Sequence, residues 1–161
     1  MEEIVQLNSN AKLSEHFVLG EFTKSGSHPE VYNIPSHEAI ANLKRLCGWL
    51  EVLRKRYNER YGGEINTPEP IRINSGYRSP QLNRKIGGAA NSNHLTGCAC
   101  DIKVSGFEQA LRYAVILLDY ADESKQEFDE LLIERNRYGA IWLHFAVRPS
   151  NNRRKIMFIN A

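Results

Sequence analysis

A long amphipathic segment between about Glu38 and Tyr61 gives the strongest structural signal in this chain. Its apolar residues recur every three or four positions, which predicts a helix with one buried face. Gly62 and Gly63 follow directly and predict where this helix ends. Cys47 belongs to the apolar stripe, so it is expected to be a core thiol rather than a reactive one. The stripe consists of Ile40, Leu43, Leu46, Cys47, Leu50, Leu53 and Tyr57.

A second long helix is predicted from Phe107 to Asp122, and short elements surround it. Residues 11–35 predict a short helix followed by irregular chain. Ser79 and Pro80 predict the N-terminus of a two-turn helix. On one side the second long helix carries Phe107, Leu111, Ala114, Val115 and Leu118. The predicted strands are 71–74, 98–104, 128–134, 140–147 and 155–159.

Helices followed by mostly strands is the order typical of an α+β protein. We therefore expect a small antiparallel sheet with the two long helices packed on one face. The 161 residues are the size of one ordinary domain, so a single domain over residues 1–161 is expected.

Composition and charge exclude several classes of protein. Hydrophobic residues at 42% and charged residues at 25% are typical of a soluble globular chain. No apolar run reaches the roughly 18 residues that span a bilayer. The acidic N-terminus does not resemble a secretory signal, so we expect cytoplasmic localisation at synthesis. A net charge of +2 is too small to predict nucleic-acid binding, and 153–155 is read as a solvated edge or turn.

The stretch Ser92-Asn-His-Leu-Thr-Gly-Cys-Ala-Cys-Asp101 holds four residues of types that bind metals: one histidine, two cysteines and one aspartate. Three cysteines cannot all pair, and Cys98 and Cys100 are too close along a strand to form a bridge, so all three are expected to be reduced. Side chains alternate along a strand, which places Asp101 on one face and both cysteines on the other. The cysteines are thus assigned to the core, and Asp101 to a cleft that it shares with His94.

A catalytic zinc takes three protein ligands and leaves a fourth position for water. His144 lies within a predicted strand between aromatic residues and is the candidate third ligand. Surface or capping roles are expected for His16, His28 and His37. From the residues alone, a metal site and a structural pair of loop histidine and strand-end aspartate both stay open.

Three motifs resemble the M15 family of zinc peptidases, which includes D-Ala-D-Ala carboxypeptidases and L-Ala-D-Glu endopeptidases. The pattern Ser92-x-His94-x-x-Gly97-x-Ala99-x-Asp101 matches at each position, and Trp142-x-His144 resembles the closing motif. The segment 75–79, followed by Leu82-Asn83 and Gly87-Gly88, resembles the upstream motif. The resemblance spans roughly residues 13–147. It is nearest to the compact peptidases of phage endolysins and cell-wall enzymes, whose core is shared with hedgehog domains.

The resemblance implies a role for each matching residue. His94, Asp101 and His144 would bind Zn²⁺. Arg78 would stabilise the oxyanion of the tetrahedral intermediate, and Ser92 would steady either its loop or the Asp101 carboxylate. The implied activity is hydrolysis of peptidoglycan stem peptides by a monomer, on the cell wall if the protein is released or exported. Cleavage of a terminal D-Ala and cleavage within the stem both agree with the resemblance.

The general base is where this chain departs from the family pattern. Many M15 enzymes carry an acidic residue three positions before the last histidine, and here that position is Ile141. The segment 128–134 instead resembles the F-D-x-L-I-x-E form of the compact branch. With a hairpin loop at 135–139, Glu134 would lie opposite Ala140, and Glu130 opposite His144. Glu134 is our candidate base, and Glu130 is second or orients His144.

Two rival functions remain at this point. The first is a binding module with the same fold and zinc but no turnover, which the missing acidic residue at 141 favours. The second is a nucleic-acid-binding domain, against which the lack of a basic groove with stacking aromatics counts.

Overall fold

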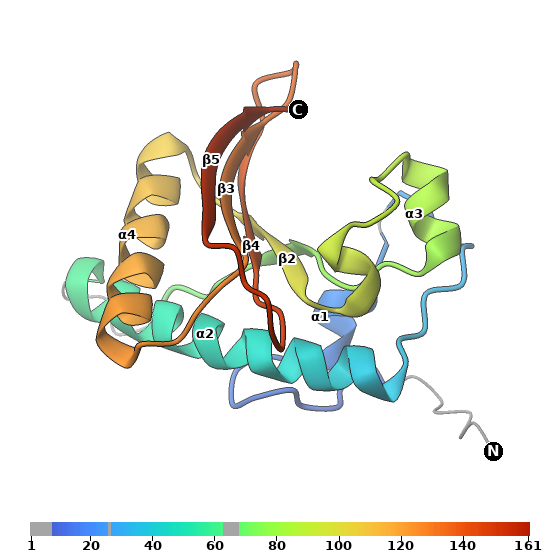
Figure 1. The fold of residues 1–161 in the computed structure, drawn as a ribbon, viewed down its shortest axis with the longest axis horizontal. Helices are drawn as coiled ribbons and strands as arrows, with labels where there is room; N and C mark the ends of the chain where they lie inside the picture. The colour runs from blue at the N-terminus through green and yellow to red at the C-terminus, as the bar shows by residue number, and fades with distance from the viewer. Residues whose placement is uncertain (1–7, 26, 63–67) are drawn as a thin grey trace.

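The computed structural model describes residues 8–25, 27–62 and 68–161 (Figure 1). Gly63, expected to help end the first long helix, lies outside these ranges, as does most of the acidic N-terminus. No helix among the described residues has the length and apolar character needed to cross a membrane. The helices are α1 (Leu19–Thr23), α2 (His37–Tyr61), α3 (Pro80–Ile86), the 3₁₀ helix η1 (Asn93–Thr96) and α4 (Phe107–Ser124). The strands are β1 (Ile73–Ser75), β2 (Ala99–Lys103), β3 (Glu130–Arg135), β4 (Ile141–Ala146) and β5 (Lys155–Asn160).

The five strands form one sheet in the order β1-β2-β4-β3-β5, which confirms the α+β class. Neighbouring strands are antiparallel except β5, which pairs parallel with β3, so the expectation of a purely antiparallel sheet is wrong for this strand. The connection after β4 crosses the start of β3, where Arg154 N donates to Phe128 O and Lys155 N to Asp129 O. A strand that begins there and runs along the free edge of β3 must be parallel to it.

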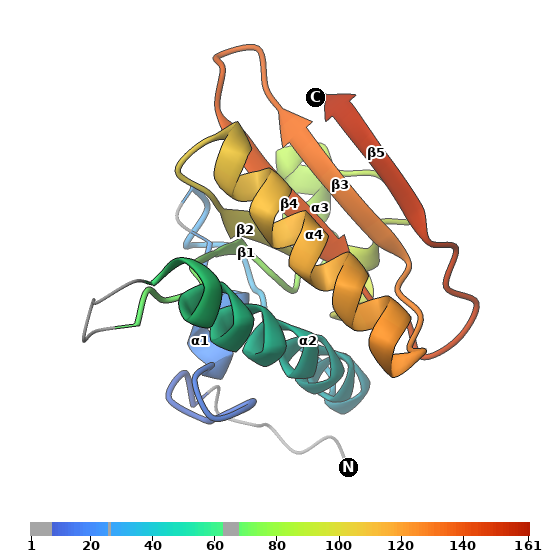
Figure 2. The same ribbon diagram turned by 90° about the vertical axis from the view of Figure 1, so that its left-hand side faces the viewer.

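The two long helices lie on one face of the sheet, as expected. Figure 2 shows α2 and α4 side by side in front of the strands, and Figure 1 shows α3 on the opposite side from α4. The apolar stripe of α2 is buried, with Leu43, Leu46, Cys47, Leu50 and Leu53 fully enclosed. The face turned away from α2 and α4 is therefore left for polar side chains.

The apolar side predicted for α4 is buried only in part, with Ala114 and Leu118 packed against the core. Phe107, Leu111 and Val115 are 46%, 44% and 47% exposed, whereas the buried side of the helix contains Tyr113 and Leu117. The reason is that α4 has two apolar stripes, and the buried one combines Tyr113 with Ile116, Leu117 and two alanines. Tyr113 packs edge-on against Tyr57 of α2, with ring centroids 4.8 Å apart. The positions of the large aliphatic residues in the sequence did not predict this contact between Tyr113 and Tyr57. The buried residues of α4 are Gln109, Ala110, Tyr113, Ile116, Leu117 and Ala121.

The register of the β3–β4 hairpin also differs from the expectation. Glu134 lies opposite Trp142 rather than Ala140, and Leu132, not Glu130, lies opposite His144. The hairpin loop lies one residue later in the sequence than the expected 135–139. Asn136 Oδ1 closes it by accepting hydrogen bonds from the amides of Tyr138 and Ala140, both at 3.0 Å. A shift of two in the pairing keeps every side chain on its own face. Glu130, Glu134 and His144 thus still share one face.

The three cysteines are free thiols and all are buried, as expected. Cys100 lies in the core on the helix side of β2. Cys98 precedes β2 and lies outside that core, with its Sγ 4.0 Å from Thr96 O. Cys98 is therefore buried as predicted, but beside the η1 loop and outside the core that contains Cys100.

Changing Cys98 and Cys100 together to alanine is expected to lower stability and leave metal binding intact. Each loses a buried sulfur, which costs on the order of 1–2 kcal/mol. The free energy of unfolding from urea titrations and the zinc content by mass spectrometry check this. Loss of zinc in a folded double variant would contradict the assignment of both thiols to the interior.

Candidate active site

Adjacent strands bring the first two candidate ligands together. In the antiparallel pair of β2 and β4, Asp101 lies directly opposite His144. His94 comes from η1, whose N-cap Ser92 accepts the amide of His94 at 3.2 Å. Gly97 ends η1 with φ 74°, and a Cβ there would lie 2.4 Å from Ala39 O of α2. Glycine at 97 therefore lets the loop dock against α2 and present His94 to the sheet.

Each histidine turns a defined nitrogen toward Asp101. His94 Nδ1 donates to the carbonyl oxygen of Gly76 at 2.7 Å, and its Nε2 lies 3.4 Å from Asp101 Oδ2. For His144 the roles are reversed: Nε2 donates to Glu130 Oε1 at 3.0 Å, and Nδ1 lies 3.0 Å from Asp101 Oδ1. Since the outer nitrogen of each ring is occupied by an acceptor, the inner nitrogen of each can face a metal.

The three residues fit a zinc ion. One ligand atom from each of His94, Asp101 and His144 lies within 4.8 Å of the others, and no further group of this kind occurs in the described ranges. Zinc bonds of about 2.0–2.1 Å in a tetrahedron place neighbouring donors about 3.3–3.5 Å apart. The contacts of Asp101 with the two histidines are close to that spacing. Two imidazoles and one carboxylate are also a donor set typical of catalytic zinc.

The electrostatics of the cluster favour a positive charge at its centre. Burial would raise the pKa of Asp101, but His94 and His144 outweigh it and hold that pKa well below its usual range. Burial would lower the pKa of His144, yet Asp101 and Glu130 raise it to about 10. Asp101 and Glu130 therefore favour a positive charge beside them in spite of burial.

Arg78 faces the same cluster. Its backbone amide donates to His94 O at 3.0 Å, and its Nη2 lies 3.7 Å from Asp101 Oδ2. Oδ1 of the buried Asn83 accepts a hydrogen bond from Arg78 Nη1 at 3.1 Å, and Nδ2 of Asn83 donates a hydrogen bond to Ala89 O. Asn83 was recognised only as part of the upstream motif, and the structure shows that it holds the Arg78 guanidinium at the edge of the site.

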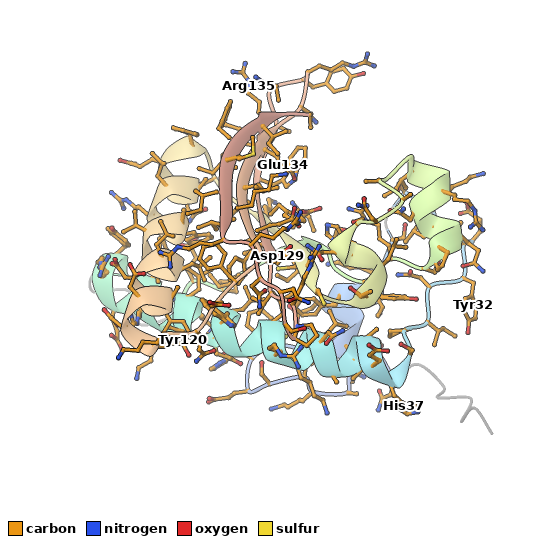
Figure 3. All side chains as sticks on the ribbon, in the orientation of Figure 1. Tyr32, His37, Tyr120, Asp129, Glu134 and Arg135 are labelled. Carbon is orange, nitrogen blue, oxygen red and sulfur yellow. The ribbon has the colours of Figure 1, made fainter. Side chains whose placement is uncertain are left out.

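Glu134 lies on the same face as the candidate ligands, one pair along from His144. Trp142 Nε1 donates to Glu134 Oε2 at 2.6 Å and fixes the direction of the carboxylate. Burial and the nearby charge of Asp101 raise the pKa of Glu134. Figure 3 labels Glu134 near the end of β3 and Asp129 just before its start. Glu134 therefore has the environment of a carboxyl group that can exchange a proton.

Comparison with known proteins places the chain in a family. Residues 15–119 match the family described as Peptidase M15, which is 105 of the 161 residues. This chain belongs to the peptidase M15 family. The curated protein named zinc D-Ala-D-Ala carboxypeptidase from Streptomyces albus G is 27% identical over 100 residues, covering 62% of this chain. The matched part spans 36% of that relative, well under two thirds of its length.

The M15 match contains only part of the site. It includes Arg78, His94 and Asp101 and ends before β3 and β4, which carry Glu130, Glu134 and His144. The strand pairing of β2 with β4 is what joins the two groups of residues.

Ile141 lies three positions before His144, where many M15 enzymes carry an acidic residue. In β4, residue 141 alternates with 142 and 144 and belongs to the helix side, where Ile141 packs against the core. An acid at 141 would therefore point away from His144 in this strand. The lack of an acidic residue at 141 therefore removes no group from the site face of β4.

Other predicted residues lie where their roles require no metal. Ser92 caps η1 through the His94 amide, the first of the two roles considered for it. His16 Nδ1 contacts Glu51 at 2.7 Å, and His28 lies 3.5 Å from Glu30. Arg153, read as a solvated residue, is exposed as expected, and it also forms an ion pair with the buried Asp129 at 2.8 Å. That contact, and the role of Asn93 beside it, were missed.

Proposed function

We propose that this M15 chain is a zinc metallopeptidase that hydrolyses peptide bonds in peptidoglycan stem peptides. The observation that carries the proposal is the convergence of His94, Asp101 and His144 from η1, β2 and β4, with Arg78 and Glu134 beside them. The name of the Streptomyces relative supports a D-amino-acid peptide as substrate. A stem peptide also carries carboxylates, which suit a cleft that contains Arg78.

His94 Nε2, Asp101 and His144 Nδ1 would hold the zinc. Bound there, zinc would lower the pKa of a water ligand toward neutrality and polarise a peptide carbonyl. Arg78 supplies the second positive group, since its guanidinium faces Asp101 and is kept in place by Asn83. We assign to it the carbonyl oxygen of the scissile bond, whose negative charge grows in the transition state.

Glu134 is the proposed general base. Because Trp142 fixes Oε2, we assign the proton to Oε1, which takes it from the attacking water and hands it to the leaving amine. The raised pKa of Glu134 suits a group that must both accept and release a proton. Glu130, bound to His144 Nε2, is proposed to orient that ligand rather than to act on water.

The test is hydrolysis of purified stem pentapeptides that end in D-Ala-D-Ala. The zinc-loaded chain should cleave them, a chelator should abolish cleavage, and added zinc should restore it. Chromatography of the products separates two outcomes: free D-Ala indicates a carboxypeptidase, and two larger fragments indicate cleavage within the stem. Intact peptides after incubation with a folded, zinc-containing chain would refute the proposal.

A binding module with the same zinc site is the second candidate. The sequence argument for it was Ile141, at a position where many family members carry an acid, but residue 141 faces the core, and Glu134 on the site face favours the enzyme. The two are separated by the same reaction: saturable binding of stem peptides without any cleavage would support the module.

Replacing Arg78 by alanine is expected to leave zinc bound and lower turnover by about 10²- to 10³-fold. The loss follows because one charged donor to the developing oxyanion disappears while the three ligands remain. Steady-state hydrolysis and zinc content check this together. The matched control is Arg60→Ala, an exposed arginine in the last turn of α2, which should hydrolyse normally. Normal turnover in Arg78→Ala would return this residue to a purely structural role.

A further inference from the structure

We propose that Asn93 is a positioning residue for the ligand His144: its side-chain amide fixes Glu130, and Glu130 fixes the His144 ring. The inference rests on the zinc site of the proposed function and adds a residue to it. Asn93 begins η1, directly before His94, and is buried. It contacts the site through Glu130 of β3 rather than through Asp101, which Arg78 faces.

The amide nitrogen of Asn93 joins two carboxylates. Nδ2 donates to Glu130 Oε1 at 2.6 Å and to Asp129 Oδ2 at 2.8 Å, so its two hydrogens have separate acceptors. Glu130 Oε1 is the same atom that accepts His144 Nε2 at 3.0 Å. Because one oxygen receives both contacts, a shift of the Asn93 amide would move the acceptor of the ligand ring.

Arginines fix Asn93 and Asp129 from the other side. Arg148 Nε donates to Asn93 Oδ1 at 2.9 Å, which sets which end of the amide faces the carboxylates. Arg153 donates to both oxygens of Asp129, from Nε at 3.0 Å and from Nη2 at 2.8 Å. Asp129 is fully buried, and although burial would raise its pKa, Arg153 and Asn93 lower that pKa to about 2. The carboxylate that anchors Asn93 is therefore ionised, and both of its oxygens accept hydrogen bonds.

These contacts link the crossing between β4 and β5 to the metal site. Arg148 and Arg153 both belong to the segment that follows β4, and Arg153 Nη2 also lies 3.6 Å from Glu130 Oε2. Asparagine suits position 93 because its amide donates to both carboxylates, whereas an aspartate would place a third carboxylate against Asp129 and Glu130. A shorter apolar side chain would leave Glu130 held on this side by His144 and Arg153 alone. The His144 ring would then be less firmly committed to turning Nδ1 toward Asp101.

The test measures zinc affinity, by competition with a chromophoric chelator, for Asn93→Ala. Loss of a group that supports a ligand typically weakens metal binding by about 10- to 100-fold, and we expect a loss in this range. The matched control is Asn91→Ala, an exposed asparagine two residues earlier, whose affinity should be unchanged. Wild-type affinity in folded Asn93→Ala would overturn the inference.

A double-variant comparison distinguishes positioning from general destabilisation. If Asn93 acts through Glu130, the variant Asn93→Ala/Glu130→Gln should bind zinc as Glu130→Gln does alone. Additive losses of affinity would overturn the inference. If Asn93→Ala fails to fold, Arg148→Ala removes the donor to Asn93 Oδ1 and should weaken zinc binding by up to about tenfold. Unchanged affinity in that variant would again overturn it.

The affinity measurement needs no hydrolysis, so it separates this inference from the proposed activity. A wild-type chain that binds zinc tightly but cleaves no stem peptide would refute the peptidase and leave the role of Asn93 to be decided by the variants. A wild-type chain that binds no zinc would overturn both.

Discussion

Changing His144 to alanine is expected to remove zinc and to lower hydrolysis of stem peptides by more than about 10³-fold, because zinc supplies several kcal/mol of transition-state stabilisation. The ring of His144 lies between Asp101 and Glu130, so its loss leaves two facing carboxylates without the third ligand. Zinc content by elemental mass spectrometry and steady-state hydrolysis give the two readouts. Circular dichroism establishes that the variant is folded.

The matched control for His144 is His28→Ala. His28 lies in the N-terminal segment beside Glu30, away from the candidate ligands, so its loss should change neither zinc content nor rate. A folded His144→Ala variant that retains one zinc per chain would remove His144 from the site, although it lies opposite Asp101.

Changing Glu134 to glutamine is expected to keep zinc bound and to lower turnover by about 10²- to 10⁴-fold, the range for one general base. Glutamine has nearly the same shape as glutamate and can still accept the hydrogen bond from Trp142 Nε1, but it cannot take a proton from water. Hydrolysis rates measured at saturating zinc isolate this effect from metal binding.

Glu130→Gln is the matched partner, since Glu130 and Glu134 share one face of β3. It removes a carboxylate from His144 Nε2, so it should weaken zinc binding by about 10- to 100-fold and have a smaller effect on turnover once zinc is saturating. Wild-type turnover in Glu134→Gln would place the base elsewhere. Equal effects of the two substitutions on zinc affinity would contradict the division of roles between them.

Much of the fold could be predicted because it depends on local periodicity. The apolar stripe of α2 and the alternation in β2 follow from spacing alone, so Leu43 and Leu50 were correctly placed in the core and Asp101 on the opposite face from Cys100. The two ends of α3 could also be predicted from the sequence, since Ser79 caps the helix and Gly87 ends it with φ 75°. The motif at 92–101 then indicated the family. The spacing of residues along the chain could not show that His144 lies opposite Asp101, because that depends on the pairing of β2 with β4.

The errors arise where several local solutions are compatible and a tertiary contact selects one. Helix α4 has two apolar stripes, and the contact of Tyr113 with Tyr57 decides which is buried. The β3–β4 register depends on how Asn136 closes its loop. Strand β5 is parallel because Arg154 and Lys155 cross the start of β3. None of these choices leaves a periodic trace in the sequence.

The supporting residues of the site were the hardest to predict. Asn93 lies inside a family motif at a variable position, and Asp129 directly precedes β3, where alternation along the strand does not place its side chain with that of Glu130. Their connection runs through Arg148 and Arg153, which are far from η1 along the chain. Only the folded arrangement of η1, β3 and the crossing after β4 brings these groups together.

Mass spectrometry of purified muropeptides after incubation with the zinc-loaded chain tests the central claim most directly. The account predicts new masses that correspond to hydrolysis of one peptide bond in the stem, either loss of a terminal D-Ala or division of the stem. The same mixture should be unchanged by the Glu134→Gln chain, which carries the same zinc. Unaltered muropeptides after incubation with folded wild-type protein that holds one zinc per chain would contradict the claim that this site is a peptidase.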